Sequence, residues 1–319
     1  MRYPLISILM SVYNETEKYI KESVSSILNQ TFSNFELIVI DDNPKRDDVK
    51  KILESFNDNR IVFHKNPTNI GLALSMNKAA EIARADIYAR MDSDDIAMPN
   101  RLQEEYNIIS DNNIDCDFVF SGYETMDDDG NYIDTYINKS YASLGNLNSL
   151  IMWKMSVIHH PTVMFKKHIF NKTNGYRNFP CSQDADLWFR MAEAGCKFSY
   201  IPQVLLRYRK NSQSVSNQKW FLQKITGYYI FSLAIERSRK GSDSFSPEQY
   251  QKYLIQWGVN DSAKENELRN SYKMLQGSFK YNRIESIIRR VYVFLSSKLL
   301  RHYYIQLLER KIRIKNIHQ

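Results

Sequence analysis

Three carboxylates, Asp92, Asp94 and Asp95, crowd into one short segment directly after a mostly apolar stretch at residues 88–91. Carboxylates this close repel one another unless solvent, a helix N-terminus or a cation offsets their charge. Hard divalent cations take oxygen ligands of this kind, and proteins commonly hold them with one or two carboxylates plus the phosphates of a substrate. The segment is therefore a candidate metal site, although acidic turns with no such role also occur at the ends of strands.

Motifs of several other classes of enzyme are absent from the sequence. No GxGxxG or GxxxxGK[ST] follows the first expected strand, which weighs against a dinucleotide oxidoreductase or a P-loop enzyme. The three cysteines, Cys116, Cys181 and Cys196, are scattered and form no CxxC or Cys/His cluster. This spacing excludes a zinc site or a disulfide framework of that kind and fits a reducing cytoplasm.

The net charge of +7 lies entirely at the C-terminal end of the chain. Residues 283–319 contain nine lysines and arginines against two glutamates, so the preceding 282 residues are neutral. Segment 284–305 interleaves apolar side chains with basic ones, which is typical of a helix that lies on an anionic membrane surface. The same pattern also fits a helix packed on the rest of the protein or on another subunit, including a second copy of the chain. Nucleic-acid binding is disfavoured because the body of the protein is neutral and carries no recognised module.

The elements that would position the acidic segment alternate regularly along the chain. Apolar runs typical of buried strands occur at residues 5–12, 35–40, 61–63 and 87–91, and amphipathic helical stretches at 17–29, 47–56 and 71–83 separate them. This alternation predicts an α/β fold, with a mostly parallel sheet covered by helices on both faces. Such sheets bind ligands beyond the carboxyl ends of their strands. Because the polar segments 13–15, 41–43 and 92–95 all follow strands, we expect them to converge at one edge.

The remaining chain divides into a mixed region and a helical one. Strands are expected at 117–122, 162–165, 198–201 and 204–208, with a hairpin turn at 126–131 and helices at 99–112 and 183–194. Beyond Trp220, periodic helical segments are expected at 221–237, 247–256, 263–281 and 284–314. No stretch approaches the roughly 18 uninterrupted apolar residues of a membrane-spanning helix.

Six segments together resemble the family 2 glycosyltransferases, which are inverting enzymes of the GT-A fold. The segments read SILMSVYNE, QTFSNFELIVIDDN, NIGLALSMNKA, DIYARMDSDDIAMPNRL, HPTVMF and QDADLWFRMAEAG. They occur in the family's order and cover residues 3–215, whereas the C-terminal third lies outside the shared core. The resemblance implies a GT-A catalytic domain over residues 1–216, with a nucleotide-sugar half to residue 98 and an acceptor half from residue 99, followed by a helical region over 217–319.

The resemblance also implies a nucleotide-binding set. Ser11 and Tyr13 would line the base pocket, with the Tyr13 ring stacked on a pyrimidine, and Asp42 would accept a hydrogen bond from the base N3–H. A carboxylate acceptor suits uracil or thymine and not cytosine, whose N3 carries no proton. The donor would therefore be a UDP- or dTDP-sugar. Alternatively, Tyr13 is a core ring at the end of a strand.

For the acidic segment, the resemblance implies that Asp94 binds Mg²⁺ or Mn²⁺ and that Asp92 contacts the ribose or a metal-bound water. Asp95 would cap a helix or support its neighbours. Asp184 falls where the family places its catalytic base, the carboxylate that takes a proton from the attacking hydroxyl. Asp186 is the rival, and at the start of a helix either carboxylate could merely satisfy free backbone N–H groups.

Two departures from the family pattern affect these expectations. Gln183 stands where many relatives have glutamate, so the neighbour of the expected base is uncharged. Asn211 replaces the histidine of the family's Tyr-Arg-x-His segment, which removes an imidazole from the metal or phosphate. Arg209 could still approach the diphosphate. His160 could contact the acceptor, with a plain structural role as the alternative.

Taken together, the resemblance implies a metal-dependent inverting transferase that moves a sugar to a hydroxyl of a saccharide acceptor. In this family the acceptor is often a lipid-linked saccharide at the cytoplasmic face, in the synthesis of capsule, O-antigen or a related cell-surface polysaccharide. The expected location is cytoplasmic and peripheral at the inner face of the membrane, through residues 283–319. The alternative is an inactive nucleotide-sugar or carbohydrate-binding partner of another transferase.

Overall fold

The computed structural model describes residues 3–142, 158–210 and 219–277, together with positions 147, 298, 300, 301 and 305. The chain divides into two compact units, Met1–Ser214 and Val215–Gln319. The predicted domain boundary at residue 216 falls in the stretch 211–218, outside the described residues. The predicted membrane-facing segment 283–319 also lies outside them, apart from the four isolated positions at 298, 300, 301 and 305.

The first unit contains a single sheet with the strand order β3-β2-β1-β4-β8-β6-β9-β5, and β7 pairs with β6 outside this path. The first four strands of the order are mutually parallel: β3 (Ile61–Lys65), β2 (Phe35–Asp41), β1 (Ile6–Val12) and β4 (Ile87–Asp92). The others are β8 (Val163–Lys166), β6 (Phe118–Met126), β9 (Phe198–Arg209), β5 (Ile96–Ala97) and β7 (Tyr132–Tyr136). Among the pairs that involve these five strands, β6 and β9 are parallel, whereas β4–β8, β6–β8, β6–β7 and β5–β9 are antiparallel. The sheet is thus parallel in its N-terminal half, as predicted, and mixed beyond β4.

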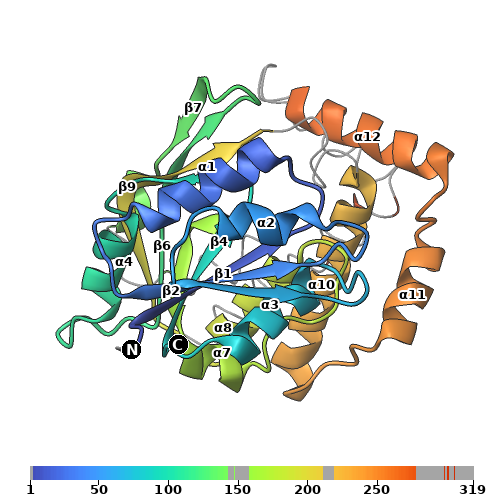
Figure 1. Ribbon diagram of the computed structural model, residues 1–319. Coiled ribbons are helices and arrows are strands. Elements are labelled where there is room, and N and C mark those ends of the chain that lie inside the picture. The colour runs from blue at the N-terminus through green and yellow to red at the C-terminus, as the bar shows by residue number, and fades with distance from the viewer. Residues whose placement is uncertain are drawn as a thin grey trace. The chain divides into compact units, whose positions relative to one another are not determined.

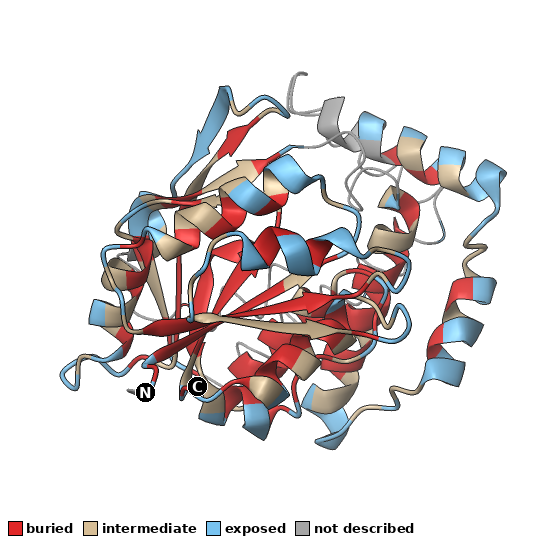
Figure 2. Ribbon diagram, viewed as in Figure 1, coloured by how far each residue is buried: buried red, intermediate tan, exposed pale blue. Residues whose placement is uncertain are grey.

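Helices cover both faces of this sheet, which confirms the predicted α/β class (Figure 1). They are α1 (Glu17–Leu28), α2 (Asp48–Glu54), α3 (Leu72–Ile82), α4 (Arg101–Ile109), α5 (Lys139–Ala142), α7 (Lys167–Lys172) and α8 (Gln183–Glu193), with a 3₁₀ turn, η1, at His160–Thr162. Buried side chains of α1, α2 and α4 form one core with alternate residues of β1, and those of α3, α7 and α8 form another on the opposite face. Figure 2 shows the strands buried between these layers. The period of two in β1 explains the division, since Ile8 and Met10 join one core while Leu9 joins the other.

Local sequence explains where the first elements begin and how they pack. Thr16 caps α1 by accepting a hydrogen bond from the backbone N–H of Tyr19 at 3.3 Å. Ile20, Val24 and Ile27 then recur at helical spacing and are fully buried. The alternation of a buried strand with a one-sided helix therefore builds the first layers of the fold.

Two differences from the sequence-based expectation have a clear structural cause. The helix expected from Pro99 begins at Arg101, because the Pro99 carbonyl accepts a hydrogen bond from the backbone N–H of Thr31 at 2.9 Å instead. The two strands expected at 198–201 and 204–208 are one strand, β9, whose register against β6 shifts on both sides of Gly122. A Cβ at Gly122 would lie 2.9 Å from the Gln203 carbonyl oxygen, so only glycine permits this close approach.

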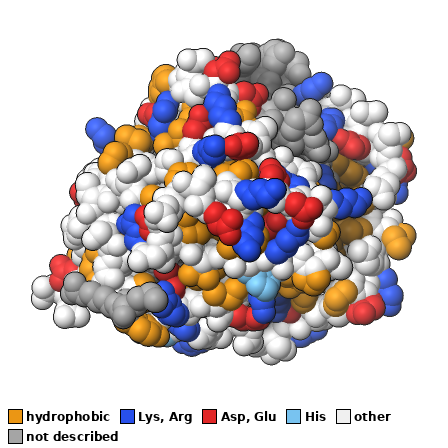
Figure 3. All heavy atoms as spheres, in the orientation of Figure 1, with side chains coloured by type: hydrophobic (Ala, Val, Ile, Leu, Met, Phe, Trp, Pro, Cys, Tyr) orange, Lys and Arg blue, Asp and Glu red, His pale blue; other side chains and the backbone are white. Residues whose placement is uncertain are grey.

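The described part of the second unit consists of α10 (Trp220–Lys240), α11 (Pro247–Gln256) and α12 (Ser262–Gly277). The Tyr250 hydroxyl of α11 lies 2.6 Å from that of Thr226 in α10, and its ring packs against Tyr229 with centroids 5.4 Å apart. Among the described residues, no helix combines the length and apolar character that a membrane crossing requires. On the face shown in Figure 3, lysine and arginine side chains lie among aspartates and glutamates.

Candidate active site

The carboxyl ends of β1, β2 and β4 lie side by side, as predicted. Ser11 is the register partner of Asp92, and Val12 is the partner of Asp41. The Ser93 hydroxyl donates to the Ser11 carbonyl at 3.0 Å, which ties the acidic turn to the end of β1. The structure therefore brings the polar loops after these three strands to one edge of the sheet.

Tyr13 lies at this edge with 42% of its surface exposed. Its backbone N–H donates to Glu15 Oε2 at 2.7 Å, and its carbonyl accepts a hydrogen bond from Asn43 Nδ2 at 3.2 Å. These contacts hold the backbone and leave the ring open to solvent. The ring is therefore accessible for stacking and is not part of the core.

Asp42 is buried, and three protein groups already donate to it. Its Oδ1 accepts from Asn66 Nδ2 at 2.8 Å and from the Ile70 N–H at 2.9 Å. Its Oδ2 accepts from the Gly71 N–H at 2.8 Å. An ionised carboxylate accepts about four hydrogen bonds, so one position remains for a base. The main structural role of Asp42 is to hold the turn that precedes α3.

The acidic turn separates its three carboxylates into different environments. Asp92 forms an ion pair with the guanidinium of Arg90, a fully buried side chain of β4. Burial and the charges of Asp92 and Glu15 raise the pKa of Asp94 to about 7. Among the described residues, no other side chain donates a hydrogen bond to the Asp94 carboxylate. The position thus has negative charge in excess and oxygen ligands to spare, which fits a divalent cation.

Asp95 differs from its neighbours because it is fully buried. Its Oδ1 accepts a hydrogen bond from the backbone N–H of Arg209 at 2.9 Å, and its Oδ2 has no partner in the described part of the chain. Burial and the charges of Asp94 and Asp92 raise its pKa above the usual range. Asp95 therefore fixes the turn to β9, and it is not a helix cap.

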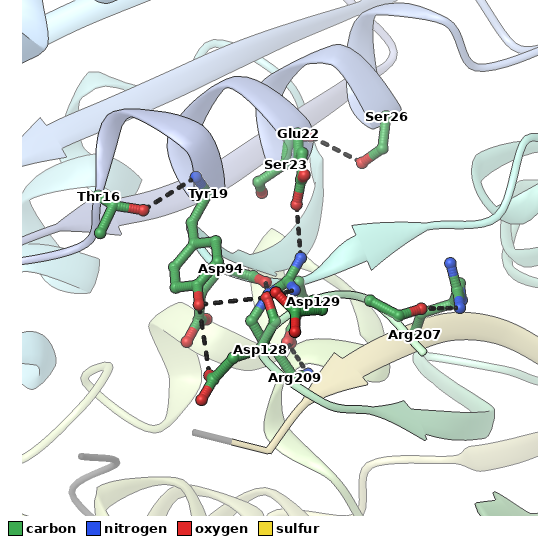
Figure 4. Close-up of polar contacts among 12 residues, drawn as sticks. Thr16, Tyr19, Glu22, Ser23, Ser26, Asp94, Asp128, Asp129, Arg207 and Arg209 are labelled. Atoms are coloured by element: carbon green, nitrogen blue, oxygen red, sulfur yellow. Dashed lines mark hydrogen bonds and ion pairs between the residues drawn. The ribbon is translucent and has the colours of Figure 1, made fainter. Parts of the chain in front are cut away.

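Arg209, which the sequence led us to expect near a diphosphate, has its guanidinium buried within the first unit. The guanidinium pairs with Glu22 Oε2 at 2.6 Å through Nη2. Its Nε donates to the Asp94 carbonyl at 2.9 Å and its Nη1 to the Asp128 carbonyl at 2.9 Å. The group also lies 4.3 Å from the ring centroid of Tyr19 (Figure 4). Arg209 therefore clamps the acidic turn, α1 and the β6–β7 turn together.

Asp184 and Asp186, the rival candidates for the base, lie in different surroundings. Asp186 is fully buried and pairs with Arg190, whose Nη2 lies 2.7 Å from Oδ2, while Arg177 Nη1 lies 3.6 Å from Oδ1. Asp184 is the second residue of α8 and is partly exposed. Burial, together with the negative charge of Asp92, raises the pKa of Asp184, against the opposing effect of backbone N–H groups in the first turn of α8. Asp186 is thus committed to an ion pair, whereas Asp184 has no ion-pair partner among the described residues.

His160 packs into the protein against Tyr176 and Trp188. Its Nε2 lies 2.8 Å from the Tyr176 hydroxyl, and its ring centroid lies 6.0 Å from that of Trp188. Burial and the charge of Arg90 hold the pKa of His160 well below its usual range, so the imidazole is neutral. These contacts match the structural alternative for His160.

No sequence pattern singled out a second histidine, His159. Its ring stacks on Tyr123 with centroids 4.3 Å apart and meets Tyr208 edge-on at 4.4 Å. Burial lowers the pKa of His159 to about 4, although the charge of Asp92 opposes this shift. Because the adjacent histidines 159 and 160 precede a proline with no periodic pattern around them, the sequence alone could not separate their roles.

Comparison with known proteins identifies the family. The family model described as Glycosyl transferase family 2 matches residues 7–173. The chain is 36% identical over 231 residues to an uncharacterized glycosyltransferase of Methanocaldococcus jannaschii, an alignment that covers 72% of this chain and 79% of that protein. It is 33% identical over 231 residues to the O-antigen biosynthesis glycosyltransferase WbnJ of Escherichia coli, with coverage of 71% and 87%.

Two solved structures share the fold at low sequence identity. The first is residues 1–349 of S. aureus TarS in complex with UDP-GlcNAc, with a TM-score of 0.59, 19% identity and coverage of 78% of this chain and 70% of that one. The second is the mannosyltransferase PcManGT from Pyrobaculum calidifontis in complex with GDP-Man and Mn²⁺, with a TM-score of 0.58, 16% identity and coverage of 99% and 88%. These likenesses confirm the GT-A fold, and together with the family match they show that the chain belongs to the family 2 glycosyltransferases.

Proposed function

We propose that this protein is an inverting glycosyltransferase that moves a sugar from a UDP- or dTDP-sugar to a hydroxyl of a saccharide acceptor. The observation that carries the proposal is the setting of Asp184. The charge of Asp92, in the acidic turn, acts on this carboxyl, and the rival Asp186 is held in an ion pair. This influence supports the proposal that Asp184 and the carboxylates of the acidic turn act in one site.

In the proposed transfer reaction, Asp184 is the base that acts on the acceptor hydroxyl. The acceptor hydroxyl oxygen forms a bond to the anomeric carbon while the bond from that carbon to the diphosphate oxygen breaks. Asp184 takes the hydroxyl proton, and the bonding electrons leave with the nucleoside diphosphate. A raised pKa suits Asp184 for this task because the base must hold the proton that it receives.

The residues of the acidic turn fit a bound cation. Asp94 would hold Mn²⁺ or Mg²⁺, with Asp92 contacting the ribose or a water on the metal, and the cation would offset the charge of the departing diphosphate. Ser11 and the exposed ring of Tyr13 would bind the base, and the remaining acceptor position of Asp42 would receive its N3–H. The UDP-GlcNAc complex of TarS supports a uridine donor.

We also propose a location at the inner face of the membrane, where a lipid-linked saccharide would be the acceptor in cell-surface polysaccharide synthesis. The name of the O-antigen relative supports this pathway class. Removing residues 283–319 should reduce sedimentation of the protein with vesicles that contain anionic lipid and leave donor hydrolysis intact. Equal sedimentation of the full and shortened chains would refute the membrane role of this segment.

Hydrolysis of sugar nucleotides tests the proposed function directly. We expect the wild type, supplied with Mn²⁺, to hydrolyse a UDP- or dTDP-sugar slowly without acceptor. A protein that binds a donor with Mn²⁺ but cleaves none of a panel of UDP-, dTDP- and GDP-sugars, with or without acceptor saccharides, would instead be the inactive binding partner.

A further inference from the structure

Asn66 is a buried residue whose side-chain amide contacts the carboxylate of Asp42. It directly follows β3, and its backbone N–H donates to the Asp41 carbonyl at 2.8 Å, which extends the pairing of β3 with β2 by one residue. Its Nδ2 donates to Asp42 Oδ1 at 2.8 Å and to the Ser75 hydroxyl oxygen of α3 at 3.2 Å. Because Asn66 is only 2% exposed, the protein alone decides how this amide is placed.

The hydrogen bonds to Asp42 are divided unevenly between its two oxygens. Oδ1 accepts from Asn66 Nδ2 and from the Ile70 N–H at 2.9 Å, whereas Oδ2 accepts from the Gly71 N–H at 2.8 Å. Each carboxylate oxygen accepts about two hydrogen bonds, so Oδ1 is filled and the open position lies on Oδ2. Both backbone N–H groups belong to one turn, and Asn66 is the only side chain that donates to Asp42 in the described part of the chain.

The carboxylate that Asn66 contacts lies at the edge where the base is proposed to bind. The Asp42 N–H donates to the Val12 carbonyl at 2.9 Å, and the residue after Val12 is Tyr13, whose ring is exposed. Uracil and thymine present an N3–H to an acceptor held there. Cytosine presents an unprotonated N3, but it carries an N4 amino donor next to that atom. A carboxylate that can turn could accept from this amino group, so rejection of cytosine requires a carboxylate that is fixed.

We propose that Asn66 is a positioning residue that sets the choice of base, because it holds the open position of Asp42 toward N3–H and thereby favours uridine and thymidine nucleotides over cytidine nucleotides. This role rests on the proposed function, in which Asp42 receives the base. With Asn66 in place, turning the carboxylate breaks a buried hydrogen bond that water cannot replace. Without Asn66, the carboxylate keeps only the two N–H groups of the turn and gains a second open position, which suits the amino group of cytosine.

Nucleotide binding to the full-length protein tests this role, measured by calorimetry with Mn²⁺ present. The probes are UDP, CDP and N3-methyl-UDP, which lacks the N3–H. We expect the wild type to bind UDP at least about tenfold more tightly than either of the other two. Asn66→Leu keeps the branched shape of the side chain without its N–H groups, and Asn66→Ala removes the side chain. Each variant should lower the ratio of UDP affinity to CDP affinity roughly three- to tenfold, as expected for one hydrogen bond.

The ratio of affinities separates positioning from a merely structural role. UDP and CDP share their ribose and diphosphate, so a general loosening of the site weakens both by the same factor. Asn77 provides the matched control, since its Nδ2 donates to the Tyr176 carbonyl at 2.8 Å and its Oδ1 accepts from the Tyr176 N–H at 2.9 Å. Asn77→Leu therefore loses two hydrogen bonds elsewhere on α3 and should keep the wild-type ratio.

The role of Asn66 is overturned if its folded variants keep the wild-type ratio, if Asn77→Leu lowers the ratio as much, or if the wild type does not prefer UDP. Hydrolysis of sugar nucleotides, measured in parallel, separates this result from the proposed function. A wild type that hydrolyses a UDP-sugar while the Asn66 variants keep its ratio retains the proposed function and loses the role of Asn66. A protein that hydrolyses no sugar nucleotide but prefers UDP through Asn66 retains the base site and loses the proposed function.

Discussion

Replacing Arg209 by methionine should destabilise the first unit strongly, because the guanidinium joins three parts of the fold. Methionine keeps the length and most of the apolar contact of the side chain but removes its hydrogen bonds to Glu22, Asp94 and Asp128. Breaking a buried ion pair by removing one partner costs about 3–5 kcal/mol. Since the Glu22 side chain is 35% exposed and regains water, we expect the lower end, about 3 kcal/mol.

Urea unfolding of the full chain, followed by far-UV circular dichroism, would measure this loss. The data should be fitted with two transitions because the chain has two units. Arg207 offers a matched control two residues earlier on β9, where it pairs with Glu124 at 2.7 Å and donates to the Gly130 carbonyl at 2.9 Å. Its side chain is 28% exposed, so Arg207→Met should cost about 1 kcal/mol or less.

The clamp role of Arg209 would be refuted if Arg209→Met lost no more stability than Arg207→Met. If the variant instead kept its stability and bound UDP many times more weakly, Arg209 would be a phosphate ligand, as first expected from the sequence. Binding of UDP in the presence of Mn²⁺, measured by calorimetry on both variants, would distinguish these outcomes.

Three further predictions concern the carboxylates of the site. Asp184→Asn should abolish sugar transfer and leave donor binding intact. Burial and the charge of Asp92 raise the pKa of Asp184, so the transfer rate of the wild type should begin to fall, as the pH is lowered, above the ordinary aspartate pKa of 3.8. A rate that holds down to that value would contradict the assignment. With its pKa at about 7, Asp94 is ionised above pH 7 and protonated below it, so Mn²⁺-dependent donor binding, followed by calorimetry, should weaken below pH 7. Asp94→Ala should bind donor equally with and without Mn²⁺, and a variant that still responds to the metal would exclude this role. Asp186→Asn should lower the free energy of unfolding by about 2 kcal/mol, because the ion pair with Arg190 is lost, and Asp184→Asn should lower it by clearly less. The opposite order in urea unfolding would reverse our assignment of the two carboxylates.

The parallel half of the fold was predictable because its signals are local. Apolar runs of five to eight residues, each followed by a polar loop, define β1, β2 and β4, and parallel pairing then requires Ser11 and Asp92 to lie at one edge. The mixed half was less predictable. The two-residue strand β5 exists only because β9 pairs with it, and no local pattern marks such a strand.

The candidate site shows the same division between local and tertiary information. The sequence placed Asp184 and Asp186 two residues apart, and only the family resemblance favoured Asp184. The arginines packed against Asp186 show how different the surroundings of the two carboxylates are. Arg209 carries a charge that suits phosphate, but its partners lie up to 187 residues away in the chain. Roles that depend on such distant partners cannot be derived from residue type and spacing.

The attachment of the acidic turn to β9 also constrains how the protein is made. The bonds from Arg209 to Asp94 and Asp95 span 115 and 114 residues, so a chain emerging from the ribosome exposes the turn long before its anchor is synthesised. Until then Asp95 lacks its backbone donor and the three carboxylates repel one another without a clamp. A nascent chain that stops before residue 209 therefore lacks the anchor of the acidic turn, which can be fixed in place only after β9 has been translated.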